Sequence, residues 1–318
     1  MSLKVGFIGT GGIARNHLEN LKKLDVEYVA MCDVDEARAR QAAEQYGGKP
    51  YTDFRRMLDE VEMDAVWVCL PPFAHGDAEA AVIERGVHMF VEKPIALTLD
   101  LARELEEKIK AAGIITSVGY QWRYQESVAT AKAKLGEEPI GMMLGYWVGG
   151  MPGVWWWRRR ETSGGQVVEQ TTHIFDLARY FGGEVKEVYA AHAQRFLHKE
   201  VENFNVDDVG TVTLKFESGA IANISSGCIA PYRVGLDIIA KNKVFSITSH
   251  GLTTVAGGDR ETLSFSDNAY LEEDRAFLEA IQTGDRSKIR SDYSDAVKTL
   301  QVTLAANESA ACGAPVAL

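Results

Sequence analysis

The 318-residue chain contains little cysteine, little positive charge and no long apolar run. Its four cysteines form no Cys-x-x-Cys pair, which excludes a disulfide scaffold and predicts reduced thiols in a cytoplasmic protein. Lysines and arginines total 34 against 45 aspartates and glutamates, so the net charge of −11 opposes binding to nucleic acid or to an anionic membrane. No run reaches the ~18 apolar residues of a membrane-spanning helix, and the strand-like opening Leu3–Ile8 is too short for a signal peptide. We therefore expect neither a nucleic-acid nor a membrane partner.

The first 120 residues alternate strand and helix patterns. Ala65–Leu70 is apolar throughout, which is typical of a strand covered on both faces of a parallel sheet. This alternation predicts a doubly wound α/β, or Rossmann, domain over residues 1–120. The other predicted strands are Leu3–Ile8, Tyr28–Cys32, His88–Val91 and Ile114–Val118, and the predicted helices cover 13–24, 35–46, 75–85 and 98–112.

Residues 121–318 show consecutive strand patterns with few helices between them. This order predicts a second, α+β domain with a largely antiparallel or mixed open sheet. We expect the last helix, Tyr293–Cys312, to pack back on the first domain. The predicted strands cover 141–148, 185–193, 209–216, 220–226, 234–240 and 244–248, and the other predicted helices cover 125–135, 167–181 and 270–283.

A glycine-rich turn follows the first predicted strand. Gly9-Thr10-Gly11-Gly12-Ile13-Ala14 fits the G-x-G-x-x-[GA] dinucleotide fingerprint, in which the glycines permit a tight turn and a close approach of the backbone to a pyrophosphate. Asp33 ends the second strand at the spacing of the acid that binds ribose hydroxyls. No arginine or lysine stands at positions 33–35 to receive a 2′-phosphate, so the pattern favours NAD over NADP. A purely structural turn with a surface aspartate is the alternative.

Two further groups of polar residues are candidates for a catalytic or ligand-binding site. Glu92-Lys93-Pro94 directly follows the predicted strand His88–Val91, at the sheet edge where α/β proteins bind ligands, although an ordinary surface lysine is the alternative. On the predicted helix 167–181, four polar side chains fall within an arc of about 60° at 100° per residue. A catalytic or sugar-binding face, a solvated face and a metal site are three interpretations, and no second histidine or cysteine at ligand spacing supports the metal. The four residues are Glu169, His173, Asp176 and Tyr180.

Motifs along nearly the whole chain extend this pattern. They are Leu70-Pro71-Pro72-x-x-His75, Val91-Glu92-Lys93-Pro94, Gly164-Gly165…Glu169…His173…Asp176…Arg179-Tyr180 and Ala276–Gly284. With the glycine turn they resemble the glucose–fructose oxidoreductase/inositol dehydrogenase/rhizopine-catabolism (Gfo/Idh/MocA) family. The resemblance implies an NAD(P)-dependent dehydrogenase that oxidises a secondary hydroxyl of a sugar or cyclitol, or reduces the ketone. It also implies a homodimer or homotetramer built on the second domain's sheet.

The resemblance makes His173 the catalytic acid/base and Lys93 its neighbour in the site. A histidine suits this role because oxidation of a carbinol needs a base near neutral pH, and a lysine ammonium can polarise the oxygen. The implied substrate contacts are Glu169, Asp176, Tyr120 and Trp122. The implied cofactor contacts are Gly9, Thr10, Gly11, Gly12, Ile13, Asp33, Leu70, Pro71, His75, Glu92 and Lys93.

Several points stay open in the sequence. Glu169 stands where inositol dehydrogenases carry aspartate, and Asp176 either orients the imidazole or binds substrate. The segment Trp155–Arg160 either lines the substrate entrance or forms a packed loop or interface. An NAD-dependent glycoside hydrolase with transient cofactor reduction and a non-enzymatic NAD-dependent sensor are the alternative functions. We expect His75 to position the loop after Pro72, and the other histidines to be structural or solvated: His17, His88, His192, His198 and His250.

Overall fold

The computed structural model describes residues 2–249 and 251–318, which divide into two compact units. Unit 1 comprises Met1–Gln121 and Asn268–Val297, and unit 2 comprises Trp122–Asp267 and Lys298–Leu318. The segment that returns to unit 1 therefore holds α10 (Ala269–Thr283) and only the first turn of α11 (Tyr293–Cys312). Most of α11 belongs to unit 2, and the expectation that the last helix packs on the first domain stays a prediction.

Unit 1 contains the predicted doubly wound sheet. Its six strands are all parallel and run in the order β3-β2-β1-β4-β5-β6, so the strand order reverses between β1 and β4. In such sheets ligands bind beyond the carboxyl ends of the strands on either side of this reversal. The strands are β1 (Leu3–Ile8), β2 (Val26–Cys32), β3 (Lys49–Tyr51), β4 (Ala65–Val68), β5 (His88–Val91) and β6 (Thr116–Val118).

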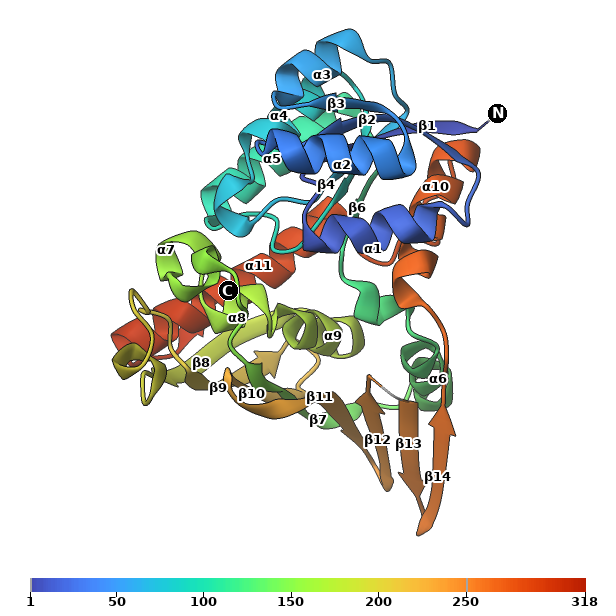
Figure 1. The fold of residues 1–318 in the computed structure, drawn as a ribbon. Coiled ribbons are helices and arrows are strands. Elements are labelled where there is room, and N and C mark those ends of the chain that lie inside the picture. The colour runs from blue at the N-terminus through green and yellow to red at the C-terminus, as the bar shows by residue number, and fades with distance from the viewer. Residues whose placement is uncertain (1, 250) are drawn as a thin grey trace. The chain divides into compact units, whose positions relative to one another are not determined.

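The helices of unit 1 begin at side chains that cap their free N–H groups. The carboxylate of Asp35 accepts from two N–H groups of α2, Asp53 does the same for α3, and Thr98 caps α5. The returning helix α10 packs along α1, as Figure 1 shows, and Phe277 of α10 lies against the ring of Trp67 in the core. The helices are α1 (Gly12–Leu21), α2 (Glu36–Tyr46), α3 (Phe54–Glu60), α4 (Asp77–Glu84) and α5 (Leu99–Ala112).

Unit 2 is built on a nine-stranded mixed sheet in the order β14-β13-β12-β11-β7-β10-β9-β8-β15. Only the β7–β10 pair is parallel among the pairings of the described residues, which confirms the predicted, mostly antiparallel sheet. The strands are β7 (Ile140–Gly150), β8 (Val185–Ala193), β9 (Val209–Phe216), β10 (Ile221–Gly227), β11 (Ile229–Ala240), β12 (Lys243–Thr248), β13 (Gly251–Ala256), β14 (Asp259–Ser264) and β15 (Val316–Ala317).

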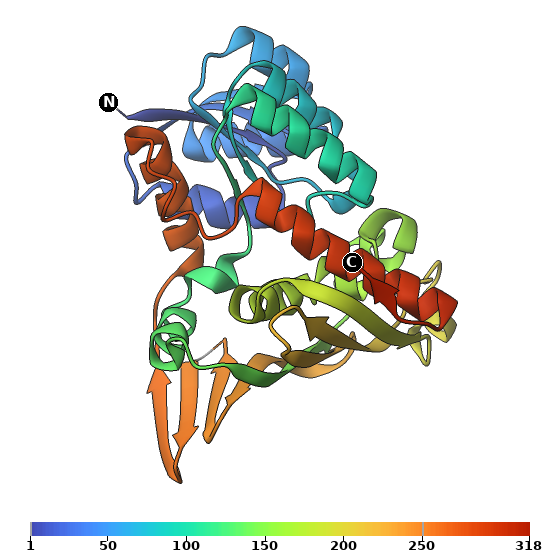
Figure 2. The same ribbon diagram turned by 180° about the vertical axis from the view of Figure 1, so that it is seen from behind.

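One face of this sheet is covered by α9 (Thr172–Gly182), which packs on β7, β10 and β11, and α6 (Glu126–Leu135) packs on β12 and β13 (Figure 1; Figure 2 from behind). Gly145 of β7 permits the close approach of α9, since a Cβ there would lie 2.5 Å from Ile174 Cγ2.

The prediction of a single helix over 167–181 is wrong in one respect. It is two helices, α8 (Gln166–Glu169) and α9, separated at Gln170–Thr171. None of the helices in the described ranges is long and apolar enough to cross a membrane.

Candidate active site

The turn after β1 has the backbone that a dinucleotide fingerprint requires. Gly9 has φ +87°, and a Cβ there would lie 2.4 Å from the carbonyl oxygen of Cys69, so only glycine fits. A Cβ at Gly11 or Gly12 would instead meet no protein atom within 4 Å. The first glycine is thus required by the protein's own packing, whereas the next two leave open space beside the chain.

The N-terminus of α1 opens into this space. Gly11 is its N-cap residue, no side chain caps it, and its first turn carries no acid. Uncapped N–H groups at a helix start attract an anion, so the turn fits the pyrophosphate of a dinucleotide. Ile13 turns its side chain toward the core of unit 1, and its contribution to such a site would be its backbone.

Asp33 follows β2 and is joined to the same turn. Its Oδ2 accepts hydrogen bonds from Thr10 N at 3.0 Å and from Thr10 Oγ1 at 3.2 Å, and its Oδ1 accepts from Asp35 N at 2.9 Å. Each carboxylate oxygen can accept more than one hydrogen bond, so Asp33 keeps capacity for ribose hydroxyls. Arg38, which lies outside positions 33–35, pairs with Asp35 at 3.3 Å. A cation is therefore present near this strand end although positions 33–35 carry none.

The loop after β4 carries Leu70, Pro71 and His75. The buried His75 ring contacts the carbonyl oxygen of Leu70 through Nε2 at 3.1 Å and the Glu79 carboxylate of α4 through Nδ1. Glu79 also accepts a hydrogen bond from Gly76 N. These contacts hold the loop at the strand-order reversal, which is the positioning role that the sequence predicted for His75.

Glu92 and Lys93 follow β5 at the same edge of the sheet, and the Lys93–Pro94 peptide bond is cis. Glu92 is buried, and its Oε2 accepts a hydrogen bond from Lys93 N at 3.1 Å. A Cβ at Gly119, after β6, would lie 2.7 Å from Glu92 Oε1, so glycine there leaves room for the carboxylate. Tyr120, the next residue, is also buried. Unit 1 thus brings the predicted cofactor residues and Lys93 to the carboxyl ends of β1, β2, β4 and β5.

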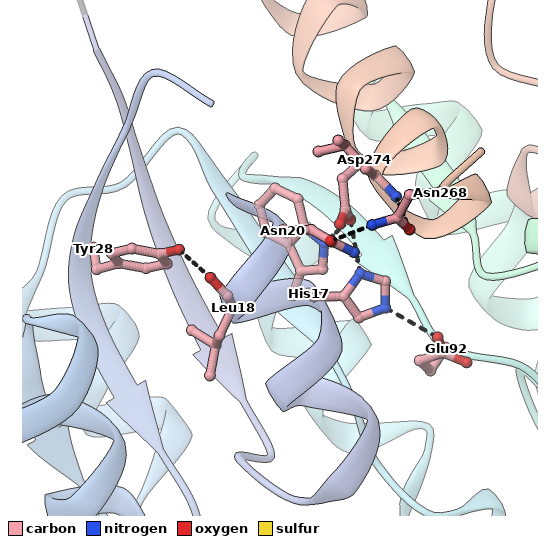
Figure 3. A network of polar contacts seen from close by, with 9 residues as sticks. His17, Leu18, Asn20, Tyr28, Glu92, Asn268 and Asp274 are labelled. Atoms are coloured by element: carbon pink, nitrogen blue, oxygen red, sulfur yellow. Dashed lines mark hydrogen bonds and ion pairs between the residues drawn. The ribbon is translucent and has the colours of Figure 1, made fainter. Parts of the chain in front are cut away.

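A buried charged cluster behind this motif was not predicted. His17 of α1, set aside in the sequence as structural or solvated, contacts Asp274 through Nδ1 at 2.7 Å and Glu92 through Nε2 at 3.1 Å (Figure 3). Burial lowers the pKa of His17, but the charges and hydrogen bonds of Asp274 and Glu92 outweigh it and raise that pKa well above its usual value. His17, Glu92 and Glu273 lie close enough to hold a cation. An imidazolium that donates from both nitrogens offers no lone pair, however, so we interpret the cluster as ion-paired.

In unit 2, His173 lies in the first turn of α9 against an aromatic wall. The ring of Trp147 on β7 stacks on the imidazole, with centroids 5.5 Å apart and planes inclined by 22°. Trp122 and Tyr232 contact Trp147 in turn, at centroid distances of 6.4 Å and 6.0 Å. Trp122 was predicted as a site residue. Trp147 on β7 and Tyr232 on β11 were missed because neither strand sequence indicates locally which ring lies beside a distant helix.

The polar face predicted for one helix is divided in the structure. Glu169 ends α8, and its Oε2 accepts a hydrogen bond from Trp157 Nε1 at 2.8 Å. Asp176 of α9 is fully buried and accepts from Arg123 Nε at 2.7 Å and Nη2 at 2.6 Å, and from Thr299 Oγ1 at 3.0 Å. These contacts favour a positioning role for Asp176 over substrate contact.

The segment Trp155–Arg160, expected either to line the substrate entrance or to form a packed loop or interface, has both buried and exposed residues. Trp157 is fully buried in a small core with Phe204 and Val206, as a packed loop would be, whereas Trp155 is 63% exposed. Tyr180, the fourth residue of the predicted face, lies under the Arg123 guanidinium at 5.0 Å. Among the remaining histidines, burial lowers the pKa of His88 and of His192, which keeps them neutral, and His198 is exposed. His250 lies outside the described residues.

Comparisons with known proteins agree with this geometry. Residues 3–120 match the model of an oxidoreductase family with an NAD-binding Rossmann fold, and residues 140–245 match the model of the GFO/IDH/MocA C-terminal domain. The two models together cover most of the chain.

Individual relatives are more distant. The chain is 28% identical to scyllo-inositol 2-dehydrogenase (NAD(+)) of Bacillus subtilis, over 99% of this chain and 96% of the relative. It is 28% identical to myo-inositol 2-dehydrogenase of Thermotoga maritima, over 89% of each chain. The structure of levoglucosan dehydrogenase with NADH superimposes with a TM-score of 0.90 at 19% identity, over 100% of this chain and 99% of that one, which shows the shared fold.

Proposed function

Because the chain belongs to the Gfo/Idh/MocA family of oxidoreductases, we propose that it is an NAD-dependent dehydrogenase acting on a secondary hydroxyl of a sugar, sugar derivative or cyclitol, or on the corresponding ketone. The observation that carries this proposal is the arrangement in unit 1. The open glycine turn, Asp33 and Lys93 all follow strands at one edge of the parallel sheet. That edge is where a doubly wound fold binds its ligand.

The residues divide into a nucleotide-binding set and a reacting set. The N–H groups at the start of α1 hold the pyrophosphate, and Asp33 accepts hydrogen bonds from ribose hydroxyls. Bound NAD supplies the hydride acceptor, or NADH the donor. The name of the Bacillus subtilis relative includes NAD(+), which supports NAD as the cofactor here.

In the reacting set, we assign to His173 the acceptance of the substrate's hydroxyl proton and to Lys93 a hydrogen bond that polarises a substrate oxygen. Oxidation needs this base, since removal of the proton lets the carbonyl form as the hydride leaves. Trp147 supports the role of His173, because ring stacking fixes the plane of the imidazole. The aromatic wall of Trp122, Trp147 and Tyr232 suits the C–H faces of a sugar or cyclitol.

We further propose that the protein is a homodimer or homotetramer formed through the sheet of unit 2. Three large apolar side chains on this sheet are solvent-exposed although they lie on regular strands: Leu144 of β7 by 38%, Tyr189 of β8 by 47% and Ile221 of β10 by 45%. Exposed apolar patches of this kind mark association surfaces. Light scattering on the purified protein tests this, and a monomer would contradict it.

The test of the activity is NADH absorbance over a panel of inositols, pentoses, anhydrosugars and sugar acids in both reaction directions. With an active substrate found, Lys93→Met and His173→Asn should each lower kcat by ~10²–10⁴-fold and leave the Kd of NADH within a few-fold. Lys110→Met, at an exposed lysine of α5, is the matched control and should leave kcat unchanged. Glycoside cleavage without net NADH formation would favour a hydrolase, and NADH binding without any turnover would favour a sensor.

A further inference from the structure

The buried contacts of His17 form a continuous chain, which we call the His17 relay: Asp274, His17 and Glu92. Asp274 Oδ1 contacts Nδ1 of the ring at 2.7 Å, and Glu92 Oε1 contacts Nε2 at 3.1 Å. Figure 3 shows the imidazole of α1 between the two carboxylates. His17 and Asp274 are fully buried, and Glu92 is 3% exposed. The relay therefore cannot bind substrate itself, and its effect must pass through its last member.

Glu92, the last member of the relay, contacts Lys93. Glu92 Oε1 faces His17, and its Oε2 accepts the hydrogen bond from Lys93 N. Gly119 lies beside the same carboxylate and leaves room for it, since a Cβ there would lie 2.7 Å from Glu92 Oε1. The backbone of Lys93 is thereby tied to the imidazole of His17 through one fixed carboxylate.

The groups around His17 also set its charge. Asp274 and Glu92 flank the ring, and Glu273 is the third buried acid beside it. Burial raises the pKa of Glu273 well above its usual value, against the opposing effect of His17, which favours the protonated form of this carboxyl. The Cys69 thiol feels the charges of all three acids and the Tyr28 phenol that of Asp274, and burial raises the pKa of both, so they stay neutral. One imidazolium between two carboxylates leaves one buried negative charge unbalanced, whereas a neutral ring between the same carboxylates would leave two.

We propose that His17 is a positioning residue, which fixes Lys93 for the reaction by holding the Glu92 carboxylate as an ion pair. This inference rests on the proposed dehydrogenase function. A charge-assisted hydrogen bond is shorter and stronger than a neutral one, so the imidazolium restrains Glu92 more firmly than a neutral side chain of the same shape. The restraint matters because a reacting group displaced by about 1 Å can lose ~10²-fold in rate.

Two variants remove the charge of the relay by different routes. His17→Gln replaces the ring, and Asp274→Asn keeps the shape of the side chain and an Oδ1 for both His17 and Trp67 Nε1. The matched control is Asn20→Ala, because Asn20 Oδ1 accepts from Asn268 Nδ2 at 2.8 Å and joins α1 to the start of α10 outside the relay (Figure 3). If the relay served only to hold α1 on α10, all three variants would show the same change in kcat.

With an active substrate, we expect His17→Gln and Asp274→Asn to lower kcat by ~10–100-fold, with KM and the Kd of NADH within about threefold. Asn20→Ala should change none of these values beyond about twofold. Equal losses in all three variants, or no loss in Asp274→Asn, would overturn the proposal. Asp274→Asn decides the question if His17→Gln does not fold.

A second measurement needs no substrate. Acetic anhydride labelling, read by mass spectrometry, gives the reactivity of each lysine, with exposed Lys110 as the internal reference. We expect the relative labelling rate of Lys93 to change at least ~3-fold in His17→Gln and Asp274→Asn and to stay constant in Asn20→Ala. Changed labelling in a protein that oxidises nothing would refute the dehydrogenase and leave the positioning of Lys93 standing. Unchanged labelling in an active enzyme would refute the relay alone.

Discussion

Replacement of Glu273 by glutamine should stabilise the protein by an amount that grows with pH. Glu273 lies on α10, is fully buried, and neither of its carboxylate oxygens has a hydrogen-bond partner in the structure. Burial raises the pKa of this carboxyl well above 4.5, the His17 charge opposes the shift, and the charges of Glu92 and Asp274 add to it. The folded protein therefore retains a proton on Glu273 that the unfolded chain gives up near neutral pH.

The magnitude follows from proton linkage. A group whose pKa is raised by folding contributes full stability below its unfolded pKa and loses that contribution as pH rises toward its folded pKa. As the pH rises above 4.5, the cost of retaining the proton grows by at most about 1.4 kcal/mol per pH unit until the pH reaches the folded pKa. Glutamine needs no proton, so Glu273→Gln escapes this cost and keeps the shape of the side chain.

The assay is urea unfolding of the wild type and the variant at pH 5, 6, 7 and 8. The difference in unfolding free energy should increase by roughly 1 kcal/mol per pH unit between pH 5 and pH 7. The raised pKa of His17 adds its own loss of stability above about pH 6.5, but this loss is common to both proteins and cancels in the difference. The neighbouring Glu272→Gln, at an exposed position of α10, is the control and should give a flat difference. A flat difference for Glu273→Gln as well would show that the buried carboxyl does not hold a proton.

Four further substitutions test the site. Gly9→Ala should lower the melting temperature by several degrees, because its Cβ would clash with the Cys69 carbonyl and Gly9 has a positive φ. Gly11→Ala should leave the melting temperature unchanged and lower the affinity for NADH at least ~10-fold in a fluorescence titration. Asp33→Ala should weaken NAD binding by ~10-fold or more in the same titration, and an unaltered Kd would remove Asp33 from the ribose site. Asp176→Asn should destabilise unit 2 by about 3–5 kcal/mol in urea, since it removes the carboxylate charge that faces the buried Arg123 guanidinium. A loss of activity without destabilisation would restore Asp176 as a substrate contact.

The sequence predicts the parallel sheet of unit 1 well because its strands are short, apolar and bounded by helix caps. The prediction for His88–Val91 matches β5 residue for residue. The elements that the sequence does not reveal are polar or brief: β3 has three residues, and β14 (Asp259–Ser264) is exposed along most of its length. Such strands exist because neighbouring strands pair with them, and a hydrophobic pattern carries no trace of that pairing.

The candidate site is predicted only in part, for a related reason. Turn chemistry is local, so the glycines, Asp33 and Lys93 can be recognised from spacing. Ion pairs are not local: Asp176 and Arg123 are 53 residues apart, and His17 is separated from Glu92 by 75 residues and from Asp274 by 257. The helical-wheel argument also assumed an unbroken helix, whereas the chain changes direction at Gln170–Thr171 before β-branched Thr172 begins α9.

The returning segment explains why a boundary at residue 120 describes unit 1 incompletely. Asp274 comes from α10, which follows strands β7 to β14 of the unit 2 sheet in the chain, and it supplies the carboxylate that holds the His17 ring from the side opposite Glu92. Without the Asp274 carboxylate, the His17 ring would keep Glu92 alone as its carboxylate partner, on the Nε2 side. The ion pair behind the Glu92-Lys93-Pro94 motif therefore requires chain that is distant in sequence, and unit 1 is a domain in space rather than in sequence.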